Sequence, residues 1–423
     1  MNALYRNSYS ALKSRSPVVE RLFYFNRNLH AGQSGREKVV ILGGGWAGYR
    51  VATDLDKKKF DVKLVSPRNY FLFTPLLPST AVGTLEFRAI EEPIRMIRGL
   101  SYYQAFCESI SFDNKSIQCR DAFFEGKSFS LEYDKLIIAC GSESNTFGIK
   151  GVKTTPHVFF LKQLEDARAI RNRMIECFEL ASSPGCSPEE RKKFLTFVIV
   201  GGGPTSIELS AEIYDFLKHD VTRCYPELFS LVKIKVIEAT PHILGSFNSG
   251  LVSYVEGLLK SRNIELMTNI AVADVVDSKI ILKDKTEIPF GMVVWSTGNK
   301  QLDFIAKLSG VKKAPNGRII IDDHLRAIAE NGENALGGGN VFALGDCAVH
   351  PQKALPLLAQ VASQQASYLS KALNKGAMES PFLYTHLVSV LFNRAVSSFS
   401  VTSYIGIDGE YWSLEGGLRS HES

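Results

Sequence analysis

Short runs of β-branched and aliphatic residues that lead directly into glycine clusters recur along the chain. The first run, 38–42, enters such a cluster, a helical pattern follows at 49–57, and a second strand pattern covers 61–65. Strand, G-x-G-x-x-G turn, helix and strand in this order predict a βαβ unit that binds a dinucleotide. The first glycine makes the tight turn, the second lets the backbone approach a pyrophosphate, and the third lets the helix pack on the strand. The residues of this turn are Gly43, Gly44, Gly45, Trp46, Ala47 and Gly48.

The end of the second strand lacks the acidic residue that usually binds a ribose in such units. Ser66 stands there, followed by Pro67 and Arg68, and these three residues are predicted to bind the cofactor of this first site. We therefore interpret this first site as one that need not hold NAD.

The same pattern returns in the middle of the chain. A strand at 197–200 precedes a second glycine cluster, and a helical stretch at 209–217 follows it. The next strand, 232–238, ends in Glu238, which is placed to accept hydrogen bonds from ribose hydroxyls and to repel a 2′-phosphate. A solvated strand-end carboxylate is the alternative, because Glu238 lies further along the chain than usual. The second turn comprises Gly201, Gly202, Gly203, Pro204, Thr205 and Ser206, with small Ser206 in place of the third glycine.

A third strand pattern, 340–344, ends in Gly345 and Asp346, and two shorter strands end at Gly141 and at Thr297 and Gly298. In flavoproteins with two nucleotide sites, an aspartate at such a strand end binds the flavin ribitol, and the short strands are the crossovers between domains. The predicted fold class is therefore α/β, with two Rossmann-like dinucleotide-binding domains that hold one FAD and one visiting NAD(P)H. The seven cysteines are scattered without a C-x-x-C pair, which disfavours a disulfide framework and a metal site. Cys140 and Cys347 are interpreted as small buried packing residues.

The positive charge is concentrated at the beginning of the chain. Residues 1–32 carry Arg6, Lys13, Arg15, Arg21 and Arg27 against Glu20 alone, which accounts for +4 of the formal net charge of +5. This Arg-rich, Ser-rich and acid-poor composition predicts a mitochondrial transit peptide, with a disordered basic tail as the alternative. Because the rest of the chain is nearly neutral, nucleic acid is not an expected partner. No apolar run reaches the length of a membrane-spanning helix.

Three stretches make the chain resemble the type II, or alternative rotenone-insensitive, NADH:quinone oxidoreductases of mitochondria and bacteria. They are 65–78, the second glycine cluster with its helix at 201–212, and the run at 355–365. The resemblance implies non-covalent FAD, NADH as substrate and ubiquinone as acceptor. It also implies a respiratory enzyme that pumps no protons and associates peripherally with the mitochondrial inner membrane.

The resemblance also assigns roles to individual residues. Thr74 and Pro75 would lie beside the flavin, although a plain proline-rich loop is the alternative. Glu208 would lie near the nicotinamide, although a carboxylate in a first helical turn is stable there without any role. Gln360 and Gln364 share a helix face with Ala359 next to them and would bind quinone, where a solvated polar face is the alternative. Glu208, Gln360 and Gln364 are the predicted catalytic residues, and no metal is expected.

The predicted organisation is a transit peptide at 1–32, an FAD domain in two pieces at 36–160 and 293–375, and an inserted NADH domain at 161–292. The remaining segment is 376–423. Its part from Asn393 to Ser423 is Ser- and Gly-rich and lacks the apolar helix with a basic face that the family uses for membrane docking. We therefore expect membrane binding by other means, a homodimer included, or an altered chain end. Two alternative functions are an NADH-responsive flavoprotein of the apoptosis-inducing-factor kind and a sulfide:quinone oxidoreductase.

Overall fold

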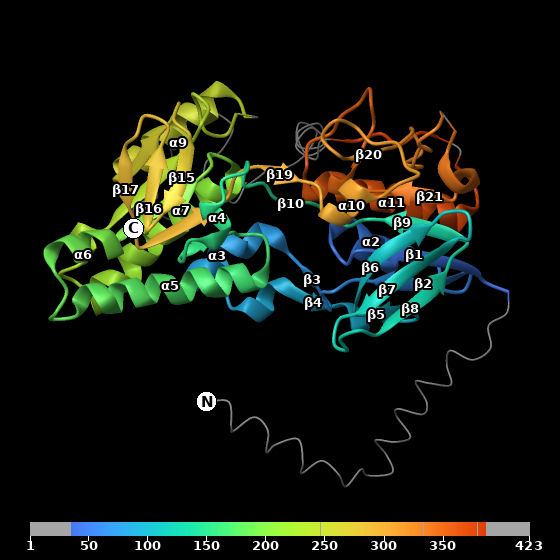
Figure 1. Ribbon diagram of the computed structural model, residues 1–423, viewed down its shortest axis with the longest axis horizontal. Coiled ribbons are helices and arrows are strands. Elements are labelled where there is room, and N and C mark those ends of the chain that lie inside the picture. Colours follow the sequence, from blue (N-terminus) through green and yellow to red (C-terminus); the bar gives the residue numbers. More distant parts are fainter. Residues whose placement is uncertain (1–34, 246, 333, 379, 386–423) are drawn as a thin grey trace, which may run out of the picture.

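The computed structural model describes residues 35–245, 247–332, 334–378 and 380–385, arranged as two lobes (Figure 1). The predicted transit peptide at 1–32 and residues 386–423 of the predicted C-terminal segment lie outside these residues. No helix among the described residues is long and apolar enough to cross a membrane.

The first lobe is built on a sheet of five parallel strands with the order β21-β9-β1-β2-β5. The central strand is fully buried over its last four residues, because its β-branched and aliphatic side chains face protein on both sides. After β1 the next strand, β2, is added on one side of the sheet, whereas after β9 the next strand, β21, is added on the other side. A ligand crevice forms at the strand ends where the order of a parallel sheet reverses in this way. The strands are β1 (Glu37–Leu42), β2 (Phe60–Val65), β5 (Ser101–Tyr103), β9 (Lys135–Ile138) and β21 (Val341–Ala343).

Two helices and an antiparallel meander complete this lobe. The helices α2 (Trp46–Asp54) and α11 (Ala359–Lys375) pack against each other and share one hydrophobic core with the sheet. The meander has the strand order β6-β7-β8 and contributes Ile117 and Leu131 to the same core. Its strands are β6 (Ala105–Ser111), β7 (Ser116–Asp121) and β8 (Ser128–Glu132).

The second lobe repeats the plan with a parallel sheet of order β11-β18-β12-β13-β14. The helices α5 (Leu164–Ser182), α6 (Pro188–Phe194), α7 (Pro204–Phe216) and α9 (Ser249–Ser261) belong to this lobe, as Figure 1 shows in green and yellow. Its parallel strands are β11 (Val158–Phe159), β12 (Thr196–Val200), β13 (Lys233–Ile237), β14 (Ile264–Met267) and β18 (Met292–Trp295), and its meander is β15 (Val272–Val276), β16 (Lys279–Leu282) and β17 (Glu287–Pro289). The α/β class with two Rossmann-like sheets is thus confirmed.

Both helices that follow the glycine clusters begin earlier than their patterns predict. The helix predicted at 49–57 is α2 (Trp46–Asp54), and the helix predicted at 209–217 is α7 (Pro204–Phe216). In α7 the first position is proline, whose fixed φ suits a first helical turn. The last residues of each glycine cluster are therefore already helical, so each helix begins directly at its glycine turn.

The lobes are joined by two chain crossings and by a segment that belongs to both. The crossings are β10 (Glu143–Ser144) and β19 (Asn299–Lys300), which pair antiparallel. In Figure 1, β3 (Tyr70–Leu72) and β4 (Glu91–Pro93) also lie between the lobes, and they pair antiparallel. The helix between them, α3 (Leu77–Val82), packs against α5 and α7 and is part of the second core.

These contacts refine the predicted domain limits of 161 and 292. Strand β11 lies before the lower limit and β18 runs past the upper one, yet both pair within the second sheet.

The short elements outside the two main sheets are η1 (Thr74–Leu76), η2 (Phe87–Ile90), η3 (Ile94–Met96), α4 (Gly151–Thr154), the π-helical turn η4 (Leu217–Val221), α8 (Thr222–Cys224), η5 (Phe229–Leu231), α10 (Asp303–Lys307), β20 (Ile319–Ile320), η6 (Leu336–Gly339), η7 (Gly345–Cys347) and β22 (Ala348–Val349).

Candidate active site

The first glycine cluster forms the tight turn that the sequence predicts. The Gly43 N–H donates to the Val65 carbonyl at 2.8 Å, and its φ of +103° lies in the region that favours glycine. A Cβ on Gly48 would lie 1.8 Å from the Gly43 oxygen, so only glycine allows α2 to pack this closely. A Cβ on Gly45, by contrast, would have no atom within 4 Å. This open space at the start of α2 fits a pyrophosphate that the free N–H groups would bind.

The three residues after β2 are held by the protein's own groups. The Ser66 hydroxyl donates to the Arg68 carbonyl at 3.0 Å, and the Pro67 carbonyl accepts from the Gln104 amide at 3.0 Å. The Arg68 guanidinium donates to Gln163 Oε1 at 2.5 Å, at the start of α5. Arg68 therefore joins the two lobes through this contact, whereas its predicted cofactor contact stays a prediction.

Thr74 and Trp46, two predicted cofactor residues, are in direct contact. The indole Nε1 of Trp46 donates to Thr74 Oγ1 at 3.0 Å, and its ring meets Phe71 edge to face at 5.1 Å. Pro75 follows within η1, where its fixed φ suits the short helix. The loop after β2 is thus fixed against the first residue of α2, next to the first glycine cluster.

Asp346 lies at the end of β21, beside the first crossing between the lobes. Its Oδ2 accepts a hydrogen bond from the Ser142 hydroxyl at 2.8 Å, and its carbonyl accepts one from the Gln301 amide at 3.1 Å. The other amide atom, Gln301 Oε1, is buried without a hydrogen-bond partner in the described structure. Gly141, also predicted here, has a φ of +73° in the turn just before Ser142.

The predicted quinone pair on α11 contacts the C-terminal segment. The Gln364 amide donates to the Thr385 carbonyl at 2.8 Å and accepts from the Thr385 N–H at 3.0 Å, as a neighbouring strand would. Gln360 accepts a hydrogen bond from the Tyr384 hydroxyl at 3.4 Å. These two residues form one face of α11, as their spacing predicts, and Ala359 is the first residue of the helix.

Gln365 is a site residue that the sequence reasoning missed. It is 4% exposed, and its Oε1 accepts the Gly345 N–H at 2.7 Å, where Gly345 has a φ of +69°. The side chain also lines a cavity of about 250 Å³ shared with Arg318, His350 and Tyr384. Three glutamines in one short run were visible in the sequence, but helical spacing placed only Gln360 and Gln364 on a common face.

Replacing Gln365 by alanine is expected to destabilise the protein by about 1–3 kcal/mol, because it leaves a buried N–H without an acceptor. The Asp346 turn follows directly, so bound flavin should be lost as well. Thermal melting and the ratio of visible to ultraviolet absorbance of the purified protein measure both effects. Gln364→Ala is the matched control, since it removes an amide of the same helix that does not touch Gly345; an equal loss in both variants would contradict the assignment.

The second glycine cluster has the same geometry as the first. Gly201 has a φ of +119°, and a Cβ on it would lie 2.6 Å from the Ser296 oxygen and 3.0 Å from Thr297. A Cβ on Gly203 would have no atom within 4 Å, so the start of α7 is open like that of α2. Ser206 is fully buried, and its hydroxyl donates to the Ser296 carbonyl at 3.4 Å. The small Ser206 side chain thus allows the close approach of helix and strand that a third glycine usually allows.

The other predicted residues of this site lie beside the turn. Pro204 and Thr205 form the first turn of α7, and Gly298, with a φ of +68°, follows Thr297.

Glu238 turns its carboxylate toward this cluster. Its Oε2 accepts the Gly202 N–H at 2.5 Å, and its Oε1 accepts both the N–H and the hydroxyl of Thr240, at 2.7 and 2.8 Å. Three donors hold the carboxylate in place beside the glycine turn, which is the placement that a ribose-binding residue requires.

Glu208 lies on the first turns of α7 and is exposed at the surface. Protein atoms around it nevertheless desolvate the carboxylate, and this partial burial, followed by the like charge of Glu212, raises the pKa of Glu208. Glu212 itself accepts hydrogen bonds from Ser79 Oγ at 2.6 Å and Thr84 Oγ1 at 2.8 Å. The two carboxylates therefore connect the helix of the second lobe with the segment around α3.

Glu212→Gln is expected to lower the pKa of Glu208, because it removes the neighbouring negative charge. Since the pKa of Glu208 is raised, its proton persists to higher pH than usual, and the variant should lose that proton at lower pH. The acidic limb of the pH profile of NADH oxidation should move to lower pH by the same amount. The double variant Ser79→Ala, Thr84→Ala retains the charge, so a comparable shift in it would refute the electrostatic explanation.

The cysteines near the crevice are not activated nucleophiles. Burial raises the pKa of the Cys347 thiol to about 11, and it raises that of Cys140 further. The Cys347 thiol donates to the carbonyls of Leu344 and Ile138. Within the described residues no three His, Cys, Asp or Glu side chains are grouped so that they could hold a metal ion.

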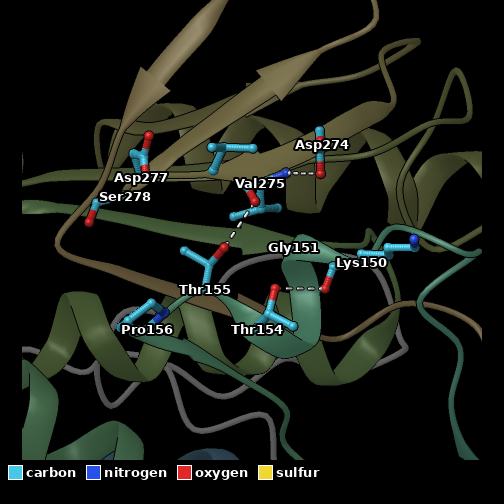
Figure 2. A pocket seen from close by; sticks show the side chains of 10 residues that line it. Lys150, Gly151, Thr154, Thr155, Pro156, Asp274, Val275, Asp277 and Ser278 are labelled. Atoms are coloured by element: carbon cyan, nitrogen blue, oxygen red, sulfur yellow. Dashed lines mark hydrogen bonds between the residues drawn. The ribbon is translucent and has the colours of Figure 1, made fainter.

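A cavity of about 600 Å³ lies apart from these residues (Figure 2). It opens between α4 and the β15–β16 turn, where Thr155 Oγ1 donates to the Val275 carbonyl at 2.9 Å. No residue of either glycine cluster lines it.

Comparison with known proteins places this geometry in a family. The family model of pyridine nucleotide-disulphide oxidoreductases matches residues 37–366. A probable NADH dehydrogenase of Dictyostelium discoideum is 42% identical over 88% of this chain and 82% of its own length. The mitochondrial internal alternative NAD(P)H-ubiquinone oxidoreductase A1 of Solanum tuberosum is 37% identical over 91% of this chain and 84% of its own. The chain belongs to the alternative NAD(P)H-ubiquinone oxidoreductases.

A solved structure of this type II family agrees with the assignment. NDH2 of Plasmodium falciparum in complex with NADH superposes with a TM-score of 0.78 at 28% identity, over 90% of this chain and 92% of that one. The sulfide:quinone oxidoreductase of Aquifex aeolicus has a TM-score of 0.62 at 22% identity, which is a likeness of fold alone. The resemblance to type II NADH:quinone oxidoreductases predicted from the sequence is thus confirmed.

Proposed function

We propose that this chain oxidises NADH and reduces ubiquinone in the mitochondrial respiratory chain, with non-covalently bound FAD between the two substrates. The observation that carries the proposal is the pair of glycine clusters with different strand ends. The cluster at Gly43 is followed by Ser66, whereas the cluster at Gly201 faces the fixed carboxylate of Glu238. Membership of the alternative NAD(P)H-ubiquinone oxidoreductases supports the same division into a resident FAD and a visiting NADH.

Each half of the site then has a definite task. The start of α2 at Gly45 binds the FAD pyrophosphate, and Asp346 binds the ribitol hydroxyls. The start of α7 at Gly203 binds the NADH pyrophosphate, and Glu238 binds its ribose. When bound, FAD supplies the group that accepts a hydride and passes on two electrons. The chain's own residues orient the partners and exclude water from between them.

Three side chains complete the proposal on the substrate faces. Glu208 lies on the α7 face near the nicotinamide site, and its raised pKa lets the carboxyl hold a proton at higher pH than an ordinary glutamate. Gln360 and Gln364 offer neutral amides that can hydrogen-bond a quinone carbonyl without placing a charge beside it. In the described structure Gln364 already pairs with Thr385, so the C-terminal segment lies next to the proposed quinone site.

We place the protein on the mitochondrial inner membrane as a peripheral, non-pumping enzyme, which the mitochondrial relatives support. Association into an oligomer, a homodimer in the simplest case, is part of this proposal. Sedimentation with liposomes tests the membrane contact: protein wholly in the supernatant contradicts it. Proton ejection in a fixed ratio to NADH oxidation would contradict the non-pumping assignment.

One spectroscopic experiment tests the proposed reaction. The purified chain should be yellow, be bleached by NADH under anaerobic conditions, and regain its colour at once when a short-chain ubiquinone is added. A slow return with a long-lived charge-transfer band would instead favour the apoptosis-inducing-factor-like function. Bleaching by sulfide but not by NADH would favour a sulfide:quinone oxidoreductase, for which the buried thiols Cys140 and Cys347 offer no activated nucleophile.

A further inference from the structure

Lys162 lies where the two crossings between the lobes meet. It follows β11 and precedes α5, and its backbone is fixed because the Lys162 N–H donates to Asp166 Oδ2 at 2.8 Å. Its ammonium donates to Asn299 Oδ1 at 2.5 Å and to Ser142 Oγ at 3.2 Å. Ser142 lies just before β10 and Asn299 begins β19, so one ammonium holds both antiparallel crossings.

Ser142 extends this contact to the proposed flavin site. Its hydroxyl donates to Asp346 Oδ2 at 2.8 Å. A serine hydroxyl carries a single hydrogen, so a Ser142 that accepts from an ammonium must point that hydrogen elsewhere, and here it points to Asp346. Within the described residues Asp346 Oδ1 receives no hydrogen bond from the protein, which leaves this oxygen for a ligand.

The charge of Lys162 is only partly offset by its surroundings. Burial lowers the pKa of the ammonium, while the carboxylates of Asp346 and Glu143 act in the opposite direction. Glu143 pairs with Lys300 at 2.7 Å. The Arg318 guanidinium also interacts with the charge of Asp346, but Lys162 reaches Asp346 through one hydrogen-bonded side chain, Ser142. Water and salt screen the charge of a half-buried cation beside a cofactor site less than they screen a cation on the surface.

We propose that Lys162 is a positioning residue for the flavin: through Ser142 it orients Asp346 toward the ribitol, and its positive charge favours the reduced flavin. The inference rests on the proposed function, because that function places FAD beside Asp346. Since reduction adds negative charge to the flavin, a nearby cation stabilises the reduced form and raises the midpoint potential. The same ammonium also holds together the two crossings that connect the lobes. It thereby helps to fix the position of one lobe, and of the substrate bound there, relative to the other.

The test compares three holoenzyme variants with the wild type by FAD dissociation constant and by flavin midpoint potential. Lys162→Met should raise the FAD dissociation constant about tenfold, the ratio expected when a charge-assisted hydrogen bond is lost, and should lower the midpoint potential. Lys162→Arg should return the potential most of the way to the wild-type value, because it restores the charge. Lys300→Met is the matched control: it removes a cation from the same crossing that contacts Glu143 and Asp303 but neither Ser142 nor Asp346.

Two results would overturn the proposal. One is a Lys162→Met protein with wild-type FAD affinity and midpoint potential, and the other is a Lys300→Met protein that changes as much as Lys162→Met. Should Lys162→Met fail to fold, Ser142→Ala breaks the same path and must weaken FAD binding, or the proposal is wrong. The proposed function fails separately, since it requires the wild type itself to bind FAD and to be bleached by NADH.

Discussion

Gly48→Ala should yield a protein that is purified without FAD and melts at a much lower temperature than the wild type. The added Cβ would lie 1.8 Å from the Gly43 oxygen, a distance that neither backbone can accommodate without moving. Overpacking of this kind costs about 3 kcal/mol or more, and here the displaced group is the turn that receives the pyrophosphate. Absorbance of the purified protein near the flavin bands and a thermal melt measure the two effects.

Gly45→Ala is the control for this prediction because its Cβ would meet no protein atom. Its backbone is extended, with φ of −85° and ψ of −163°, so alanine fits the chain there. This variant should melt close to the wild type when both are stripped of FAD, yet bind FAD more weakly because the methyl group enters the ligand space. If Gly48→Ala retains FAD and stability while Gly45→Ala loses both, the assignment of the turn is wrong.

Glu238→Gln should increase the use of NADPH relative to NADH. The amide retains the shape and an acceptor for the Gly202 N–H, but it removes the charge that repels a 2′-phosphate. We expect the NADPH to NADH ratio of kcat/KM to rise about ten- to hundredfold, with most of the change in KM for NADPH. Steady-state rates with both nucleotides and one soluble quinone give this ratio directly.

Thr240→Val separates the charge from the loop geometry. Thr240 donates to the same carboxylate through its hydroxyl, so valine disturbs the arrangement and leaves the negative charge in place. Its NADPH to NADH ratio should stay near the wild-type value. A large rise in Thr240→Val, or none in Glu238→Gln, would mean that selectivity arises from something other than the charge of Glu238.

The features that depend on residues close together in the chain could be predicted from the sequence. Both glycine turns follow from the spacing of Gly43 and Gly201 within buried strands, because backbone φ and close packing leave few other residues possible there. The carboxylate of Glu238 could be placed for the same reason, since strand ends in a parallel sheet meet at one edge. Helix starts were predicted less accurately because the residues directly after each glycine turn, Trp46 and Pro204, were assigned to the turn although they begin the helices.

Long-range contacts account for what the sequence did not predict. The role of Gln365 depends on η7 lying beside α11, and helical spacing alone favours Gln364. The crossings at Ser142 and Asn299 are recognisable as short strands, but their joint contact with Lys162 exists only once both lobes are folded. Such contacts join residues far apart in the chain, and no pattern within one segment encodes them.

The helix α3 has a consequence for any attempt to exchange parts of this protein. It comes from the N-terminal stretch, yet Leu77 and Ala81 are buried in the core around α5 and α7 of the other lobe. The inserted domain at 161–292 therefore does not contain all the residues of its own hydrophobic core. A chimera in which only 161–292 is replaced by the same region of a relative would lack the native α3 side of that core. The segment 70–93 therefore has to be exchanged together with 161–292.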